Sequence, residues 1–205
     1  MLRQNGDCRM SIPPYGVRSA HLFSSSIAGF FAEKLEISQE KSMHPVVSLR
    51  ELPLQTQSHG GTYEAHMAAV AAPFGAKRLG ARYVEIPPGK KAWPFHCHHA
   101  NDELFVILAG AGVLRYGEEE HDVSAGDVVV CPAGGVETAH QLRAKGSEPL
   151  RYLAISTMIE PDVLEYPDSG KVTVFAGAAP GGDKAARRLE LTVRKNAAVG
   201  YWGEE

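Results

Sequence analysis

The residues best suited to chemistry are three histidines and a glutamate in one stretch of the chain. His96 and His98 are two positions apart, and on a β-strand that spacing points both imidazoles to the same face. Glu103 follows after a short polar loop, and His140 would supply a fourth ligand from a distant segment. Three imidazoles and one carboxylate suit a divalent transition metal better than calcium or magnesium, which prefer oxygen ligands. We therefore predict that His96, His98, Glu103 and His140 bind one divalent transition metal: Mn, Fe, Zn or Ni.

Three neighbours of these residues are expected to have other roles. Strand alternation turns the side chain of Cys97 away from both flanking histidines, which predicts a packing role for its thiol. The same alternation turns His99 away, so it is expected behind the ligands or in solvent. Asp102 lies beside the loop and is a candidate hydrogen-bond partner for a liganding histidine.

The segments around the predicted ligands are short strands separated by Gly and Pro. Strands are predicted over residues 82–86, 103–108, 113–116, 128–130 and 150–155. Gly126 and Asp127 predict a hairpin turn between the strand that contains Val123 and the strand over 128–130. Such spacing is typical of an all-β barrel or jelly roll. Phe95, Phe105 and Ile107 are expected to form the apolar wall of its interior.

The same residues resemble the two sequence motifs of the cupin family. The first motif, a glycine, an HxH pair, a glutamate and a closing glycine, is matched by Gly89, His96, His98, Glu103 and Gly110. The second, a glycine, PxG and a histidine, is matched by Gly126, Pro132-Ala133-Gly134 and His140. The resemblance implies a single cupin β-barrel, with the four ligands near its wide end and metal positions left open for a substrate.

The chain departs from the cupin pattern near the last ligand. Five residues separate Gly134 from His140 where two are usual, so the loop before this histidine is longer. Ala144 stands where an asparagine is often found four residues after the histidine, which removes one structural hydrogen bond but no ligand.

Four segments are predicted along the chain. Residues 1–42 are expected to be a flexible or targeting-like extension with helical or irregular structure, and Met43 is a candidate functional start. Residues 43–78 are a lead-in that packs on the barrel, and residues 79–160 form the cupin barrel core. Residues 161–205 form a C-terminal extension, with a strand through Leu189, Leu191 and Val193 and an aromatic-acidic tail.

Composition excludes several classes of partner. The net charge is −3 with both signs interspersed, so nothing indicates binding to nucleic acid or to an anionic membrane. No apolar stretch approaches the roughly 20 residues of a transmembrane helix. The three cysteines, Cys8, Cys97 and Cys131, are odd in number and widely spaced, which favours a reducing compartment and a cytoplasmic location.

The cupin resemblance implies a metal-dependent enzyme that acts on a small polar substrate, and a homodimer. A subset of single-domain cupins named as sugar-phosphate isomerases is similar over residues 165–171 and in the tail, although residues 165–171 also read as a simple turn. Two alternatives stay open: an iron-dependent dioxygenase, and a non-catalytic module that binds a small ligand or metal. Candidate phosphate ligands, each favoured instead as an exposed surface charge, are Arg82, Lys90, Lys91 and Arg115.

Overall fold

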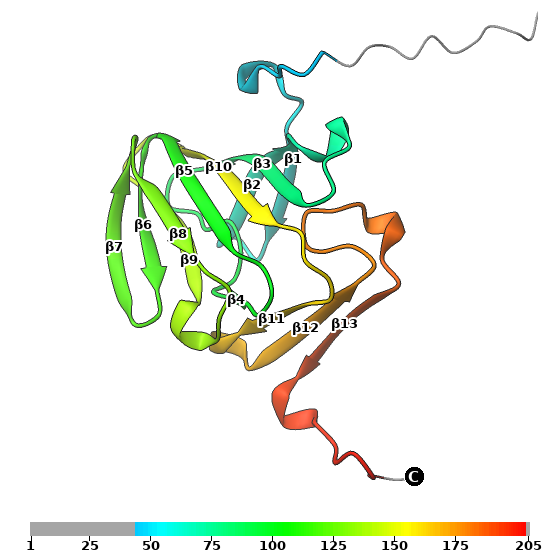
Figure 1. The fold of residues 1–205 in the computed structure, drawn as a ribbon. Coiled ribbons are helices and arrows are strands. Elements are labelled where there is room, and N and C mark those ends of the chain that lie inside the picture. The colour runs from blue at the N-terminus through cyan, green and yellow to red at the C-terminus, as the bar shows by residue number, and fades with distance from the viewer. Residues whose placement is uncertain (1–43, 204–205) are drawn as a thin grey trace, which may run out of the picture. The chain divides into compact units, whose positions relative to one another are not determined.

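A six-stranded antiparallel sheet forms one layer of the protein (Figure 1). The computed structural model describes residues 44–203. The strand order in this sheet is β1-β2-β3-β10-β5-β8, with bounds β1 (Gln55–His59), β2 (Tyr63–Ala69), β3 (Leu79–Ile86), β10 (Leu150–Thr157), β5 (Glu103–Ala109) and β8 (Val128–Cys131). The predicted segment 1–42 lies outside the described residues.

The second layer consists of two smaller sheets that meet at the predicted metal ligands. One sheet has the order β13-β12-β11-β4, with β13 (Leu189–Arg194), β12 (Lys171–Ala176), β11 (Asp162–Tyr166) and β4 (Cys97–His98). The other has the order β7-β6-β9, with β7 (Glu119–Ser124), β6 (Ala111–Tyr116) and β9 (His140–Lys145). Two backbone hydrogen bonds, of 2.8 and 3.2 Å, connect His96 and His140 and so join the two sheets.

The helical elements between residues 44 and 203 are single 3-10 turns. They are η1 (Leu49–Glu51), η2 (Ala72–Phe74), η3 (Val136–Thr138), η4 (Pro167–Ser169), η5 (Lys184–Ala186) and η6 (Lys195–Ala197). No helix in this part of the chain has the length and apolar character needed to cross a bilayer.

The hydrophobic core lies between the six-stranded sheet and β7-β6-β9. Alternate residues of the strands supply it, as expected for sheets with one buried face. Its largest fully buried side chains include Tyr152, Ile86, Ile107 and Leu150. This arrangement confirms the predicted all-β jelly roll. The alternating residues Leu189, Leu191 and Val193 also lie in a strand, β13, which pairs with β12.

The predicted hairpin around Gly126 is wrong. The strands on either side of this turn belong to different sheets, because β7 pairs with β6 while β8 pairs with β5. The turn is held by β5 instead: Gly126 N–H donates to Ile107 O, and Ile107 N–H donates to Asp127 O, each at 2.9 Å. The chain therefore crosses from one layer to the other here, which closes the sandwich beside the core.

Gly110 supports a stability prediction, because it sits in the left-handed region with φ +78° where β5 turns into β6. A Cβ at this position would collide with the carbonyl oxygen of Pro149 and lie 3.1 Å from Leu150 Cα. Backbone strain and this clash together should make Gly110→Ala cost about 3–5 kcal/mol of unfolding free energy in urea titrations. Gly126 (φ +99°) has open space around it, so Gly126→Ala should cost only about 1–3 kcal/mol. Equal losses in the two variants would contradict the packing argument.

Candidate metal centre

The four predicted ligands meet in space although they come from three separate parts of the chain. His98 lies in β4, which pairs with β11, and His96 lies just before it. Glu103 begins β5 and His140 begins β9. Potential ligand atoms of His96, His98 and Glu103 all lie within 4.8 Å of one another. His140 completes the group, because its Nε2 lies 2.9 Å from Glu103 Oε2.

Hydrogen bonds to oxygen define the tautomer of each imidazole. Nδ1 of His96 lies 2.8 Å from the carbonyl oxygen of Pro94, and Nδ1 of His140 lies 3.1 Å from that of Thr138. A carbonyl oxygen can only accept, so both Nδ1 atoms must carry the proton. His98 Nδ1 lies 2.7 Å from Oδ2 of Asp162, which is a carboxylate acceptor. Each imidazole therefore has Nε2 available as a ligand atom, the usual arrangement of a metal-binding histidine.

The contact between His140 and Glu103 indicates that the cluster suits a cation. Nε2 of His140 lies 2.9 Å from a carboxylate oxygen of Glu103, a contact that is favourable when either a proton or a metal ion lies between the two atoms. A second acceptor, His98 Nε2, lies 3.6 Å from the same oxygen. Donors bound to zinc at about 2.1 Å and at the tetrahedral angle would lie about 3.4 Å apart, between the two contacts of 2.9 and 3.6 Å. The donor set thus fits a divalent transition metal in both chemistry and spacing.

Electrostatics keep His96 and Glu103 in the protonation states that a metal requires. Burial, with the neighbouring His140 and His98, lowers the pKa of His96 to about 3, so this imidazole is neutral. Burial by itself would raise the pKa of Glu103, but the hydrogen bond with His140 and the nearby histidines outweigh it and hold that pKa at about 2. The cluster therefore offers an anionic carboxylate beside a neutral imidazole at physiological pH.

Asp162 is a functional residue that the sequence did not reveal. Its side chain is fully buried and binds His98 Nδ1, and it also accepts from the backbone N–H of Ala100 at 3.3 Å. Burial opposes ionisation, yet the hydrogen bonds from His98 and Ala100 lower the pKa of Asp162 below its usual range. The candidate for this role was Asp102, which is wrong: Asp102 is exposed and accepts from Ala133 N–H at 2.9 Å.

The cluster lines a cavity of about 410 Å³ inside the barrel. Phe105, Tyr152 and Leu164 supply part of its apolar wall, and Tyr166 stacks against His96 with ring centroids 6.1 Å apart. Tyr166 belongs to the segment over 165–171, whose Pro167–Ser169 portion is the 3-10 turn η4. The segment is therefore a turn between the end of β11 and the start of β12, and Tyr166 within it borders the cavity.

The other side chains singled out from the sequence lie mostly outside this cavity. Cys97 is buried beside Phe95 and Ala139, which confirms its packing role, and His99 is solvent-facing with its side chain 43% exposed. Phe95 therefore lies in a separate small cluster, and Ile107 packs in the main core without lining the cavity.

Of the four candidate phosphate ligands, Arg82 alone lines the cavity. Arg115 pairs with Asp168 at 2.8 Å, and its guanidinium lies over the Phe95 ring. Lys90 donates to the carbonyl oxygen of Gly61. The interpretation of Arg82 as an exposed surface charge is therefore wrong, because alternation along β3 turns it inward beside the buried Val84.

The longer loop before His140 contributes directly to the site. It contains η3, whose last residue, Thr138, provides the carbonyl oxygen that holds His140 Nδ1. The backbone N–H of Gly134 donates to His98 O at 2.8 Å, which ties the loop to β4. The extra residues thus orient one histidine and brace the strand that carries another.

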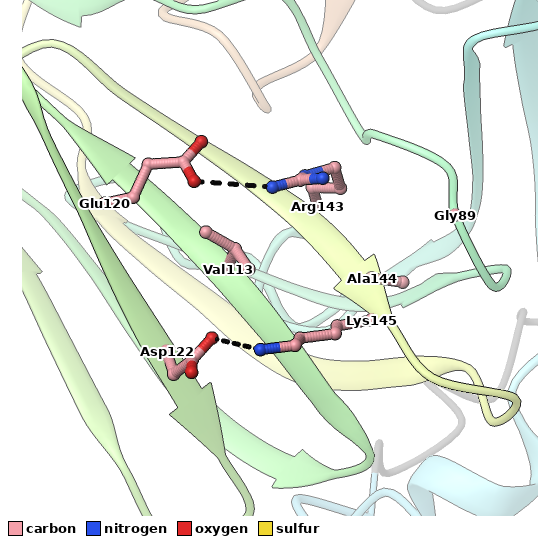
Figure 2. A pocket seen from close by; sticks show the side chains of 7 residues that line it. All are labelled: Gly89, Val113, Glu120, Asp122, Arg143, Ala144 and Lys145. Atoms are coloured by element: carbon pink, nitrogen blue, oxygen red, sulfur yellow. Dashed lines mark hydrogen bonds and ion pairs between the residues drawn. The ribbon is translucent and has the colours of Figure 1, made fainter.

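A second hollow, of about 460 Å³, lies over the sheet β7-β6-β9 on the side away from the core (Figure 2). Two ion pairs cross it, Arg143–Glu120 at 3.5 Å and Lys145–Asp122 at 2.8 Å. Val113 lies beneath them, as Figure 2 shows. These charges neutralise one another and the hollow contains no histidine, so the chemistry is assigned to the interior cavity.

Comparison with known proteins agrees with this arrangement. The family model described as "Cupin domain" matches residues 82–156, which include all four residues of the cluster. An oxalate-binding protein of Thermotoga maritima is 30% identical over 95 residues, a stretch that covers 46% of this chain and 74% of that protein.

Two solved structures resemble most of the chain. One is a provisionally named sugar phosphate isomerase of Acidithiobacillus ferrooxidans, with 19% identity, a TM-score of 0.63, and coverage of 76% of this chain and 96% of the other. The second is a sugar phosphate isomerase of the cupin superfamily from Silicibacter pomeroyi, with 19% identity, a TM-score of 0.60, and coverage of 75% and 95%. At this identity the likeness shows a shared fold.

The role of Asp162 predicts how its replacement changes metal binding. Asp162→Asn removes the negative charge that orients His98 and makes it a better ligand, so zinc affinity should fall by about 10–100-fold. Asp102→Asn is the matched control, because this exposed residue keeps an oxygen to accept from Ala133 and should leave the affinity unchanged. Competition with a zinc-binding dye measures both, and a larger loss in the Asp102 variant would contradict the assignment.

Proposed function

The chain belongs to the cupin superfamily, and we propose that it is a metal-dependent enzyme acting on a small polar substrate, with aldose–ketose isomerisation of a sugar phosphate as its reaction. The observation that carries the proposal is the set of imidazoles whose Nδ1 atoms are held by oxygen acceptors, beside an ionised carboxylate, in the wall of a cavity. A cavity of about 410 Å³ is of the size that small-molecule sites have.

In this proposal His96, His98, Glu103 and His140 hold one divalent transition metal. When bound, such a metal polarises a carbonyl oxygen of the substrate and stabilises developing negative charge. Three neutral imidazoles and one carboxylate leave a net charge of +1 on a divalent ion, which favours an anionic or enediolate-forming substrate. Asp162 keeps His98 oriented, and the backbone pairing of His96 with His140 keeps their side chains together.

Two tyrosines contribute polar groups next to the ligands. Burial and the nearby Glu103 raise the pKa of Tyr152 far above its usual range, so its phenol keeps its proton and is available to donate to a ligand in the cavity. Tyr166 packs on His96 and restricts the movement of that ring. The apolar side chains of Phe105 and Leu164 exclude water from the same space.

A second candidate function is a binding module that holds a small ligand or metal without turnover. The similarity to an oxalate-binding protein favours it, because that relative is named for binding. Both functions use the same cavity and the same ligand set, so turnover distinguishes them.

Metal analysis and activity together test the main proposal. The wild-type protein should bind one equivalent of zinc or manganese, and His96→Ala, Glu103→Ala and His140→Ala should each weaken binding by at least about 10-fold while the fold persists. His99→Ala, with its exposed imidazole outside the cluster, is the control and should bind normally.

Turnover of aldose phosphates by the manganese or zinc form, lost in the ligand variants, would support the isomerase. Oxygen uptake by the iron form would point to the dioxygenase alternative instead. Ligand binding without turnover in any metal form would support the binding module, and failure of the wild type to bind metal would refute the enzyme.

We further propose that the chain forms a homodimer through the six-stranded sheet at β5 and β8. The outward residues Leu108, Val128 and Val130 are 40%, 55% and 62% exposed and apolar, and β8 is the end strand of the sheet. Pairing with a second copy would cover this surface and the free strand edge.

Sedimentation at micromolar concentration tests the dimer. The wild type should sediment as a dimer, and Val130→Glu should give a monomer because it places a charge in the apolar contact. Val46→Glu, at an exposed apolar residue before η1, should leave the dimer intact. A monomeric wild type would refute the proposal.

We also propose a cytoplasmic location. Cys97 and Cys131 are free and buried, so the described fold uses no disulfide between them. This pattern suits a reducing compartment.

A further inference from the structure

Two arginines line the same cavity as the proposed metal ligands. Arg82 projects inward from β3, on the same face of the strand as the fully buried Val84 and Ile86. Arg187 follows η5 at its C-terminal cap and reaches the cavity from the C-terminal segment. Charged side chains are almost never placed in a barrel interior without a partner, because desolvation of the charge is costly.

Arg82 has no such partner within the described part of the chain. None of the ion pairs or side-chain hydrogen bonds among residues 44–203 involves its guanidinium. Small residues surround it: Ala154 pairs with it across β10, and a Cβ on Gly181 would lie 3.4 Å from its Nη2. These neighbours leave space beside the guanidinium. Burial and the charge of Arg187 lower the pKa of Arg82, while Glu103 opposes this effect.

Arg187 also has a polar group without a hydrogen-bond partner in the described part of the chain. Its side chain is only 10% exposed, and its Nε is the one buried side-chain nitrogen or oxygen without a hydrogen-bond partner in residues 44–203. Its Nη1 contacts the more exposed carboxylate of Glu190, and its guanidinium lies 4.6 Å from the centre of the Phe175 ring. One side of this guanidinium is therefore held in place while a donor stays free.

Glu103, the acidic group that raises the pKa of Arg82, does not balance this positive charge. Glu103 belongs to the proposed ligand set, so a bound metal would take its negative charge and leave Arg82 still less compensated. Lys184 also lines the cavity and adds a further positive charge. An arrangement with two guanidiniums and a free donor matches an oxyanion, which accepts several hydrogen bonds at once.

We propose that Arg82 and Arg187 form a subsite for an oxyanion, a phosphate or carboxylate group of the substrate, whose other end reaches the metal. This inference deepens the proposed function and rests on it for the metal, but the anion subsite is separable from metal binding. The arginines belong to β3 and to the segment after η5, whereas the four metal ligands lie between residues 96 and 140.

Anion binding to the full-length protein, as purified and after treatment with a chelator, tests the subsite. Inorganic phosphate and oxalate are titrated at constant ionic strength by calorimetry, and the tighter of the two identifies the group. Arg82→Met and Arg187→Met should each weaken that anion by about 10–100-fold, because each removes charge-assisted hydrogen bonds. Arg188→Met is the matched control, an exposed arginine outside the cavity, and should bind within about twofold of the wild type.

Thermal unfolding distinguishes a ligand subsite from a structural pair of arginines. The bound anion at ten times its wild-type Kd should raise the wild-type Tm by about 3–6 °C and that of Arg82→Met by less than about 2 °C. Without anion, Arg82→Met should melt at or above the wild-type temperature, because an unpaired desolvated charge has been removed. A lower Tm for Arg82→Met, or anion affinity unaffected by both substitutions, would overturn the proposal.

The variant His98→Ala separates this proposal from the metal site. It should lose metal and still bind the anion in the chelator-treated protein. Loss of anion binding in this variant with both arginines present would assign the anion to the metal ligands and overturn the subsite. Failure of the wild type to bind metal, with anion binding intact, would refute the proposed enzyme and leave the subsite standing.

Discussion

The chemistry of this protein depends on three hydrogen bonds that imidazole Nδ1 atoms donate to oxygen. Two of the acceptors are backbone carbonyls close in sequence to the histidines, and the third is the buried carboxylate of Asp162. With these protons in place, each histidine has an Nε2 lone pair available. Glu103 adds an anionic oxygen 2.9 Å from one of these atoms, a contact that either a proton or a metal ion between the two atoms stabilises.

The fold holds the histidines and Glu103 together because its two layers meet at these residues. His96 and His140 pair through their backbones where two sheets of one layer meet, while Glu103 begins a strand of the opposite layer. Strands of both layers hold the proposed ligands, so the whole sandwich positions them. The geometry of the site and the stability of the fold therefore depend on the same backbone pairing. The cavity beside these residues also has two positively charged side chains in its wall, Arg82 and Arg187.

Sequence patterns predicted the features that depend only on residues close together in the chain. The spacing of His96 and His98 was sufficient to predict that both imidazoles face the same side, because alternation along a strand is a local property. The same alternation predicted that Cys97 faces away from the proposed ligands. The jelly roll followed from short strands with regular turns. The turn at Gly126 was misassigned because a tight turn does not say which sheet the next strand joins.

The features that the sequence did not predict depend on contacts between residues far apart in the chain. Asp162 lies 64 residues from the histidine that it orients, and nothing in its surrounding sequence distinguishes it from a surface acid. Arg187 reaches the cavity from the connection between β12 and β13, and the sequence does not specify that β12 pairs with β11. Arg82 could have been assigned from alternation, because it shares a strand face with Val84, but an arginine in a strand is far more often exposed.

X-ray absorption spectroscopy of the protein loaded with one equivalent of zinc tests whether the four proposed ligands bind the metal. Nitrogen and oxygen ligands at about 2.0–2.2 Å are expected, with multiple-scattering intensity from three imidazoles. Ligation by sulfur, or by fewer than three imidazoles, would contradict this ligand set.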